Sequence, residues 1–188
     1  MPLRISFNLG DADLQHFQEV AQQASARERS AEAIVAAARQ TLEAAERAQL
    51  ADFVRERFAR LRSILSMAMD PDWPIGAEDS QRILNALACF GAPAAAGEVN
   101  LGFLDQAIMI ELVSRDLEHD LAAYRDFCKF RESKMTQRRR PGEEQDARRE
   151  EWLKQRRAML QNRMHERRKR TLDAAGSSVR KLFSLFGL

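Results

Sequence analysis

Asp105 is the first residue whose type and position could support chemistry. It follows the segment "GAPAAAGEVNLGFL", and Glu98 lies seven residues before it. Closely spaced carboxylates can bind a cation or keep a proton between them. One carboxylate at the start of an expected helix is more typical of a first helical turn, where the dipole favours negative charge. We therefore expect no catalytic and no metal-binding residue here.

His119 is the second candidate, because it lies among acids in "RDLEHDLAAY". Its acidic neighbours point in different directions on a helix, and the sequence contains no HExxH motif or repeated histidine spacing. We expect a histidine at the surface or at the boundary of the core. His16 and His165 are isolated in the sequence and indicate no site.

The common catalytic and phosphate-binding motifs are absent from the sequence. It contains no GxxxxGK[ST], GxGxxG or GxSxG motif. Cys89 and Cys128 lie in apolar contexts without metal-ligand spacing, which indicates reduced thiols. We expect a protein that is not an enzyme and that takes no cofactor and no small-molecule substrate. A metal-dependent enzyme around Asp105 is the least favoured alternative.

Charge is divided unevenly along the chain. Residues 1–128 contain 12 Lys and Arg against 20 Asp and Glu, a net charge of −8, whereas residues 129–188 contain 18 against 8, a net charge of +10. Such a basic tail favours contact with a polyanion, although interleaved acids would pair with many of these cations along a helix. The candidate polyanion contacts are Arg138, Arg139, Arg140, Arg167, Arg168, Lys169 and Arg170.

The last twelve residues, "SSVRKLFSLFGL", form an amphipathic pattern. The segment is too short to span a bilayer but suits either a protein groove or an anionic membrane surface. The sequence leaves three places open for it: a partner, a membrane, or the chain's own core. The apolar face consists of Val179, Leu182, Phe183 and Phe186, with Arg180 and Lys181 beside it.

Composition predicts an all-α fold for the elements that hold these residues. Ala, Leu, Arg, Glu and Gln are abundant, and Val, Thr and Tyr are sparse. The periodicity predicts an extended segment and a series of helices. The segment covers residues 1–8, and the helices cover 11–24 with Asp11 as cap, 30–69 as one continuous signal, 77–90, 101–134, 143–172 and a final short helix.

Two apolar stripes define the expected core. One follows 4, 3, 4 spacing and comprises Val54, Phe58, Leu61 and Leu65, and the other comprises Ile110, Val113, Leu117, Leu121, Tyr124 and Cys128. The helix over 143–172 has only a narrow stripe among many charges, so it either projects from the body or lies across it along one seam. That stripe comprises Trp152, Leu153, Met159, Leu160 and Met164.

The segment "LGFLDQAIMIELVSRDLEHDLAAYRDF" resembles the YkvA-like family, a bacterial domain of unknown function. Phe90, Pro93, Gly102, Phe103, Leu104, Asp105 and Ala107 fit the family's frame, in which a Pro-rich loop precedes Gly-aromatic-Leu-Asp-Asp-Ala. Asp70-Pro71 to Trp73-Pro74 resembles the loop before the preceding helix. Two departures remove acids from the frame: small residues occupy 94–97, and Gln106 replaces the second Asp.

These patterns together predict three parts. They are an N-terminal segment and helical arm over 1–49, a YkvA-like helical core over 50–134, and a basic helical tail over 135–188 with an amphipathic end. The leading hypothesis is a non-enzymatic adaptor or structural protein that binds a protein partner or itself. A secretory signal pattern is absent, so we expect it in the cytoplasm, either free or at the inner membrane surface. The alternative is a nucleic-acid-associated protein.

Overall fold

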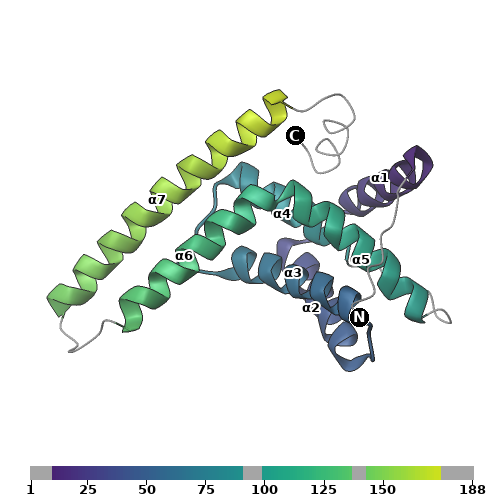
Figure 1. The fold of residues 1–188 in the computed structure, drawn as a ribbon, viewed down its shortest axis with the longest axis horizontal. Helices are drawn as coiled ribbons and strands as arrows, with labels where there is room; N and C mark the ends of the chain where they lie inside the picture. The colour runs from purple at the N-terminus through teal and green to yellow at the C-terminus, as the bar shows by residue number, and fades with distance from the viewer. Residues whose placement is uncertain (1–9, 91–98, 137–142, 175–188) are drawn as a thin grey trace, which may run out of the picture.

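The computed structural model describes residues 10–90, 99–136 and 143–174, and every regular element within them is helical. The predicted all-α fold is confirmed (Figure 1). In chain order the helices are α1 (Asp11–Ser25), α2 (Ala31–Arg47), α3 (Asp52–Met69), α4 (Ala77–Ala88), α5 (Val99–Asp116), α6 (Glu118–Thr136) and α7 (Glu143–Ala174).

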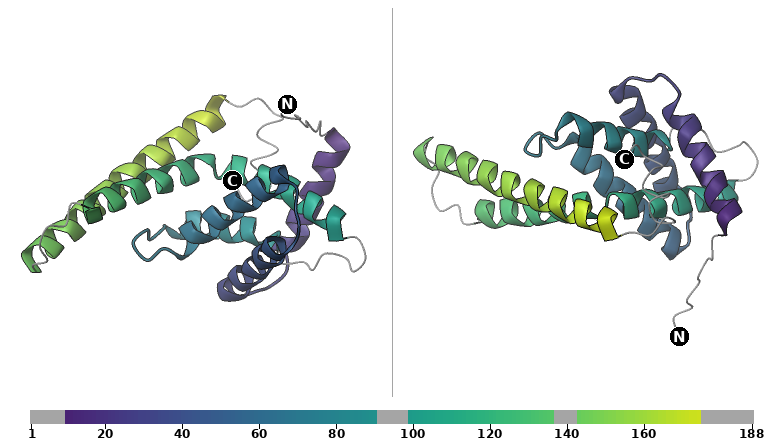
Figure 2. Two further views of the ribbon diagram at one scale, coloured as in Figure 1. Left: turned by 60° about the horizontal axis from the view of Figure 1, so that its bottom comes forward. Right: turned by 90° about the horizontal axis from the view of Figure 1, so that it is seen from above.

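The helices form a body and a projecting pair. In the body, α3 packs against α5, α2 and α4, and α1 packs on α4. α5 and α6 follow one another as a bent rod, and α7 runs back along α6 in the opposite direction (Figure 1). All three views show this pair extending beyond the body (Figure 2). We call the pair of α6 and α7 the arm.

The two predicted stripes are buried. All four residues of the α3 stripe are in the core, and so are all residues of the second stripe except the half-buried Cys128. The core also includes Phe17 from α1, Leu42 from α2 and Leu160 from α7. Apolar packing is therefore continuous from the first described helix to the last, and extends on both sides of 50–134.

The expected single helix over 30–69 is two helices. Ser30 caps α2 by accepting a hydrogen bond from the N–H of Ala33 at 3.2 Å, and the helix ends at Arg47, because the backbone of Ala48 is extended. The linking residues 48–51 contain neither Gly nor Pro. The break lets α3 pack against α2, and this tertiary packing outweighs the local preference for helix.

The expected helix over 101–134 bends at Leu117, between α5 and α6. The backbone bonds from Leu117 to Val113 and from Leu121 to Leu117 persist at 3.0 and 2.9 Å, so the rod is bent without being cut. At the bend, Arg82 of α4 donates to the main-chain oxygen of Asp116 at 3.3 Å. A side chain that hydrogen-bonds to a backbone carbonyl within a helix is one of the recognised causes of a kink.

Two predicted helix starts are also displaced. Gly10, not Asp11, is the residue before α1, and its N–H donates to the carboxylate of Asp13 at 2.9 Å. Helix α5 begins at Val99, which puts Asp105 in its second turn. The expectation of a first-turn carboxylate at Asp105 is therefore wrong.

The stripe predicted along α7 divides between two faces. Leu153, Leu160 and Met164 are buried against the rest of the protein, whereas Trp152 and Met159 are exposed. Helical geometry explains the division, because 153, 160 and 164 share one face, and 152 and 159 lie together about 100° away from it. The arm is therefore joined along one seam, and a second apolar face points outward.

None of the described helices is long and apolar enough to cross a membrane. The predicted extended segment over 1–8 and the amphipathic face over 179–186 lie outside the described residues.

Candidate functional site

Five charged side chains from four helices meet where the arm joins the body. Each is less than a tenth exposed, which is unusual for ionic residues unless they are paired. We call this group the ion-pair cluster. It consists of Asp79 and Arg82 from α4, Asp116 from the end of α5, Asp120 from α6 and Arg168 from α7.

Arg168 joins three helices. One terminal nitrogen of its guanidinium donates to Asp79 Oδ1 at 2.7 Å, and the other donates to Asp120 Oδ1 at 2.8 Å. The planar fork of arginine suits such a bridge, because it directs two donors to two acceptors at once. Helix α7 is thereby fixed to α4 and α6 by one side chain.

Arg82 occupies the centre of the same cluster. Its Nη2 donates to the carboxylate of Asp116 at 3.3 Å, and its Nη1 lies 3.5 Å from Asp120 Oδ1 and 3.7 Å from Asp79 Oδ1. It also holds the Asp116 carbonyl at the bend. The same guanidinium therefore stabilises the bend in the rod and balances the charge of the aspartates around it.

His165 closes the solvent side of the cluster. Its Nε2 donates to Asp79 Oδ2 at 2.7 Å, and its side chain is about half exposed. His165 lies three residues before Arg168 on α7, so both side chains reach Asp79 from one helical face. This role was not predictable from sequence spacing, because the two partners are 86 residues apart.

The three carboxylates differ in acidity. Burial acts to raise the pKa of Asp79, but the hydrogen bonds and charges of His165 and Arg168 outweigh it and hold that pKa below its ordinary value. Burial raises the pKa of Asp116 to about 6, and the charge of Arg82 opposes it only in part. Burial also raises the pKa of Asp120, against Arg168 and Arg82.

These differences follow from an imbalance of charge. Three carboxylates face two guanidinium groups, and within the described part of the chain one oxygen each of Asp116 and Asp120 accepts no hydrogen bond. A buried carboxylate that lacks full pairing favours its neutral form. The raised pKa values of Asp116 and Asp120 are therefore a consequence of incomplete pairing in a buried site.

The cluster's contacts suit structural anchoring rather than metal binding. Among the residues that the structure describes, no group of three or more His, Cys, Asp or Glu side chains is placed to hold a metal ion. Arginine donors already occupy the carboxylates of Asp79 and Asp120. What the cluster provides is a fixed connection between the arm and the body.

The loop between α3 and α4 makes a second connection. Asp70 accepts hydrogen bonds from Tyr124 at 2.8 Å and from Arg131 at 2.9 Å, both on α6. Buried Trp73 packs its ring against the rings of Tyr124 and Phe127, with centroids 5.8 and 5.0 Å apart. The side chain of Trp73 thus fixes the loop to the arm by apolar contact.

Helix α7 holds the same loop from its other side. Arg157 donates to the main-chain oxygen of Asp72, and Gln161 to that of Pro74, both at 2.9 Å. Because residues 157, 161, 165 and 168 follow helical spacing, one face of α7 contacts first the loop and then the ion-pair cluster.

The far half of the arm is joined by contacts between cations and rings. The ammonium of Lys134 lies 4.7 Å from the ring centroid of Trp152, and the guanidinium of Arg156 lies 5.4 Å from that of Phe130. Such contacts are individually weak at exposed sites. They keep the aromatic ring of Trp152 beside α6 while about half of its surface remains exposed.

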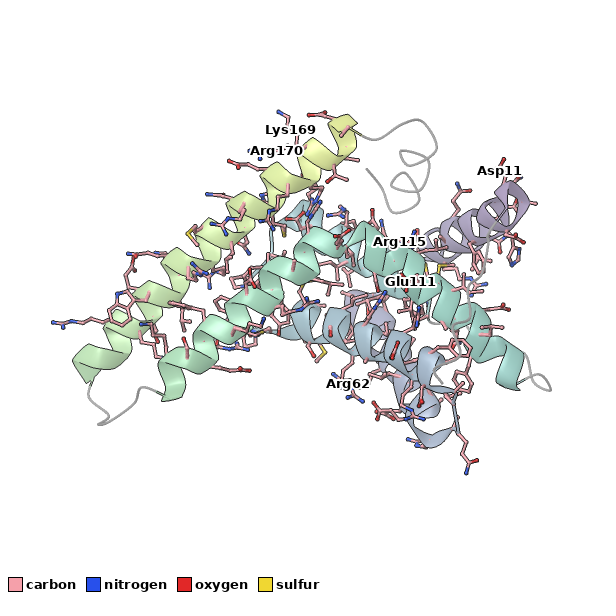
Figure 3. The ribbon with its side chains drawn as sticks, viewed as in Figure 1. Asp11, Arg62, Glu111, Arg115, Lys169 and Arg170 are labelled. Atoms are coloured by element: carbon pink, nitrogen blue, oxygen red, sulfur yellow. The ribbon has the colours of Figure 1, made fainter. Side chains whose placement is uncertain are left out.

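The structure separates the predicted polyanion contacts. Arg167, Lys169 and Arg170 are exposed near the end of α7, and Figure 3 shows Lys169 and Arg170 there. Arg168 is only 8% exposed, and its guanidinium is bound by Asp79 and Asp120. The expectation that Arg168 contacts a polyanion is therefore wrong, because its charge is neutralised inside the protein.

The other candidates do not come together. Asp105 is exposed on α5. His119 is half-buried, and a 2.8 Å hydrogen bond joins its Nε2 to the hydroxyl of Thr171 on α7, which agrees with a boundary histidine. Glu98, Arg138, Arg139, Arg140 and the terminal candidates Val179, Arg180, Lys181, Leu182, Phe183 and Phe186 lie outside the described residues.

Comparison with known proteins gives no relative: no family model, no curated protein and no solved structure matches the chain. The resemblance to the YkvA-like family therefore stays a prediction.

We predict that Asp120→Ala strongly destabilises the protein. The substitution leaves the buried guanidinium groups of Arg168 and Arg82 short of a partner, which typically costs about 3–5 kcal/mol. Glu166→Ala is the matched control, because it breaks an exposed pair with Arg170 on the same helix and should cost about 1 kcal/mol or less. Chemical denaturation of both variants measures the difference, and equal losses would contradict a buried anchor.

We also predict that Asp116→Asn changes how stability depends on pH. The Asp116 pKa is about 6 in the folded protein and about 3.9 in the unfolded chain. Its contribution to stability is therefore complete below pH 4 and is lost as the pH rises through 6, by up to about 3 kcal/mol. Asparagine does not titrate, so the variant should gain stability relative to the natural protein between pH 4 and 7.

Denaturation curves of the two proteins at several pH values test this expectation. A stability difference that stays constant across the range would show that Asp116 ionises at its ordinary pKa.

Proposed function

We propose that this protein is a non-enzymatic adaptor or structural protein whose α6–α7 arm binds a protein partner. The observation that carries the proposal is the outward apolar face of α7. Trp152 is 49% exposed and Met159 is 39% exposed, and they lie seven residues apart on one side of the helix. We call these two residues the outer face of the arm.

The two residue types of the outer face are typical of protein-binding sites. Tryptophan is the residue type most enriched among the side chains that dominate protein interfaces, and methionine adapts to irregular apolar surfaces. The outer face is bordered by exposed polar residues, among them Glu151, Gln155 and Asn162. An apolar centre with a polar border is the usual arrangement of a protein interface.

The fixation of the arm supports the same role. Ordering a flexible segment at the moment of binding lowers affinity, and a helix that is already held in place avoids that cost. Arg168, Arg157 and Gln161 hold α7 on the protein through contacts that do not involve the outer face. The partner would therefore meet a formed helix.

The sequence leaves two further contacts open. A second copy of the chain would pair its arm with this one, since symmetric association brings the same surface together twice. The terminal face of Val179, Leu182, Phe183 and Phe186 would add a contact with the partner or with an anionic membrane surface.

We predict that the double variant Trp152→Ala/Met159→Ala loses its partner while remaining folded. Truncating such central residues usually weakens an interface by about 2 kcal/mol or more for each, which is about 30-fold. Affinity purification from the native cell measures partner recovery, and light scattering measures self-association. The control is Glu150→Ala/Lys154→Ala, which alters exposed charged residues of the same helix on a side away from the outer face.

Deletion of residues 176–188 separates the contribution of the terminal segment. The role of the outer face would be refuted if the natural protein and the double variant Trp152→Ala/Met159→Ala recovered the partner equally and had the same mass in solution.

Nucleic-acid binding is the second candidate, favoured by the cations at the end of α7. Arg163, Arg167, Lys169 and Arg170 are exposed there, and among these only Arg170 has an acidic partner in the described structure, Glu166 at 3.6 Å. Four cations within eight residues suit contact with phosphates. The buried Arg168 is not part of this surface.

We predict for this candidate that duplex DNA or RNA binds at low salt and that Arg167→Gln/Lys169→Gln weakens it. The logarithm of the affinity should fall with the logarithm of salt, with a slope reduced by about 2 in the variant. Electrophoretic shift at several salt concentrations measures both effects. No shift of labelled nucleic acid at low salt would remove this candidate.

A further inference from the structure

A groove of about 660 Å³ lies between α3 and the bent rod of α5 and α6. Its volume is within the range of sites for small molecules. Charged residues in its lining are mainly basic: Arg60, Arg62, Arg115 and Arg125 against Glu111 and Glu118. Figure 3 shows Glu111 and Arg115 on α5 and Arg62 on α3. The lining therefore has two positive charges in excess.

Most of the positive charge lies at one end of the groove. Glu111 Oε2 lies 2.6 Å from Nη1 of Arg60 and 3.4 Å from Nε of Arg57, and its Oε1 lies 3.6 Å from Nε of Arg115. Three guanidinium groups thus surround one carboxylate. The burial of Glu111 would raise its pKa, but these arginines hold that pKa below its ordinary value.

Arg125 adds an uncompensated cation further along α6. Its side chain is exposed, and no hydrogen bond or ion pair joins its guanidinium to any described residue. Arg62 is different, because Glu46 of α2 already pairs with it. Arg125 is therefore the cation of the groove that is free to meet a ligand.

A buried hydroxyl in the lining lacks a partner. Ser114 is 7% exposed, and its Oγ makes no hydrogen bond within the described structure. A serine in a helix usually bonds to a carbonyl of the preceding turn, as Ser63 on the opposite wall does with Ala59 at 3.1 Å. Its Oγ is closed to solvent, so Ser114 lines the groove without offering its hydroxyl to a ligand.

The remaining wall is apolar. Leu121, Tyr124 and Cys128 follow one face of α6 along the groove. The Tyr124 hydroxyl is engaged by Asp70 at 2.8 Å and by the Ser66 carbonyl at 3.3 Å, so its ring is fixed in place. This wall suits the organic part of a ligand whose anionic group lies near the arginines.

We propose that this groove binds a small organic phosphate, with Arg125 holding the phosphate and Arg60 and Arg115 adding positive charge at the end of the groove near Glu111. A phosphate monoester carries a charge of about −1.5 to −2 at neutral pH, opposite in sign to the excess charge of the lining. It also offers several acceptor oxygens, and arginine binds such groups through paired donors. The proposal is independent of the arm's proposed function.

Isothermal titration with ATP, pyrophosphate and adenosine, all without divalent metal, tests the proposal. We expect ATP and pyrophosphate to bind saturably and adenosine to bind at least about tenfold more weakly, because it lacks the charge. Arg125→Gln should weaken ATP binding about tenfold. Arg163→Gln, on the exposed surface of α7, is the matched charge control and should leave it unchanged.

Ser114→Ala is a second control, inside the lining of the groove. Because the Ser114 Oγ is closed to solvent, the variant should bind ATP as the natural protein does, and it should keep the melting temperature of the free protein, since it removes an unpaired hydroxyl. The double variant Trp152→Ala/Met159→Ala should bind ATP as the natural protein does. The ATP-binding result would therefore stand even if the arm binds no protein partner.

A second experiment, with lipid vesicles, distinguishes a lipid headgroup from a soluble phosphate. Phosphatidylcholine vesicles with and without phosphatidic acid are sedimented with the natural protein and with Arg125→Gln. Binding to phosphatidic acid that depends on Arg125, with no binding of ATP, would assign the groove to a headgroup. Absence of binding to both probes, or equal weakening by Arg163→Gln and Arg125→Gln, would overturn the proposal.

Discussion

The bridge from Arg168 to Asp79 and Asp120 is the interaction on which the arrangement of the arm depends. The other contacts of α7 are a narrow apolar seam, hydrogen bonds of single side chains and cation–ring contacts, and none of them joins three helices through one side chain. Buried ion pairs are seldom the most stable solution, because desolvation offsets much of the attraction. Their geometric demands are strict, however, and two acceptors on two helices define where α7 lies.

Local patterns of sequence predicted the helical class and the inner stripes correctly. The residues of the α3 stripe and of the α5–α6 rod are buried as periodicity indicates, because an amphipathic helix has one way to bury its apolar face. The helix breaks at 48–51 and at Leu117 were not predictable in this way. Neither contains Gly or Pro, and both depend on contacts with residues distant in the sequence.

The candidate sites show the same limit. Arg168 and its exposed neighbours belong to one basic run in the sequence, and only the fold distinguishes the paired residue from the exposed ones. Trp152 and Leu153 are adjacent, yet one is outside and the other inside. Ser114 gave no signal at all, because a missing hydrogen bond is a property of the packed structure.

The distance between the partners of the bridge also bears on how the chain reaches its fold during synthesis. Asp79 is made 89 residues before Arg168, so the carboxylate leaves the ribosome long before its partner exists. Until then water must solvate Asp79, and the site between α4 and α6 stays open. A chain truncated before Arg168 would therefore leave the carboxylates of Asp79 and Asp120 without that guanidinium.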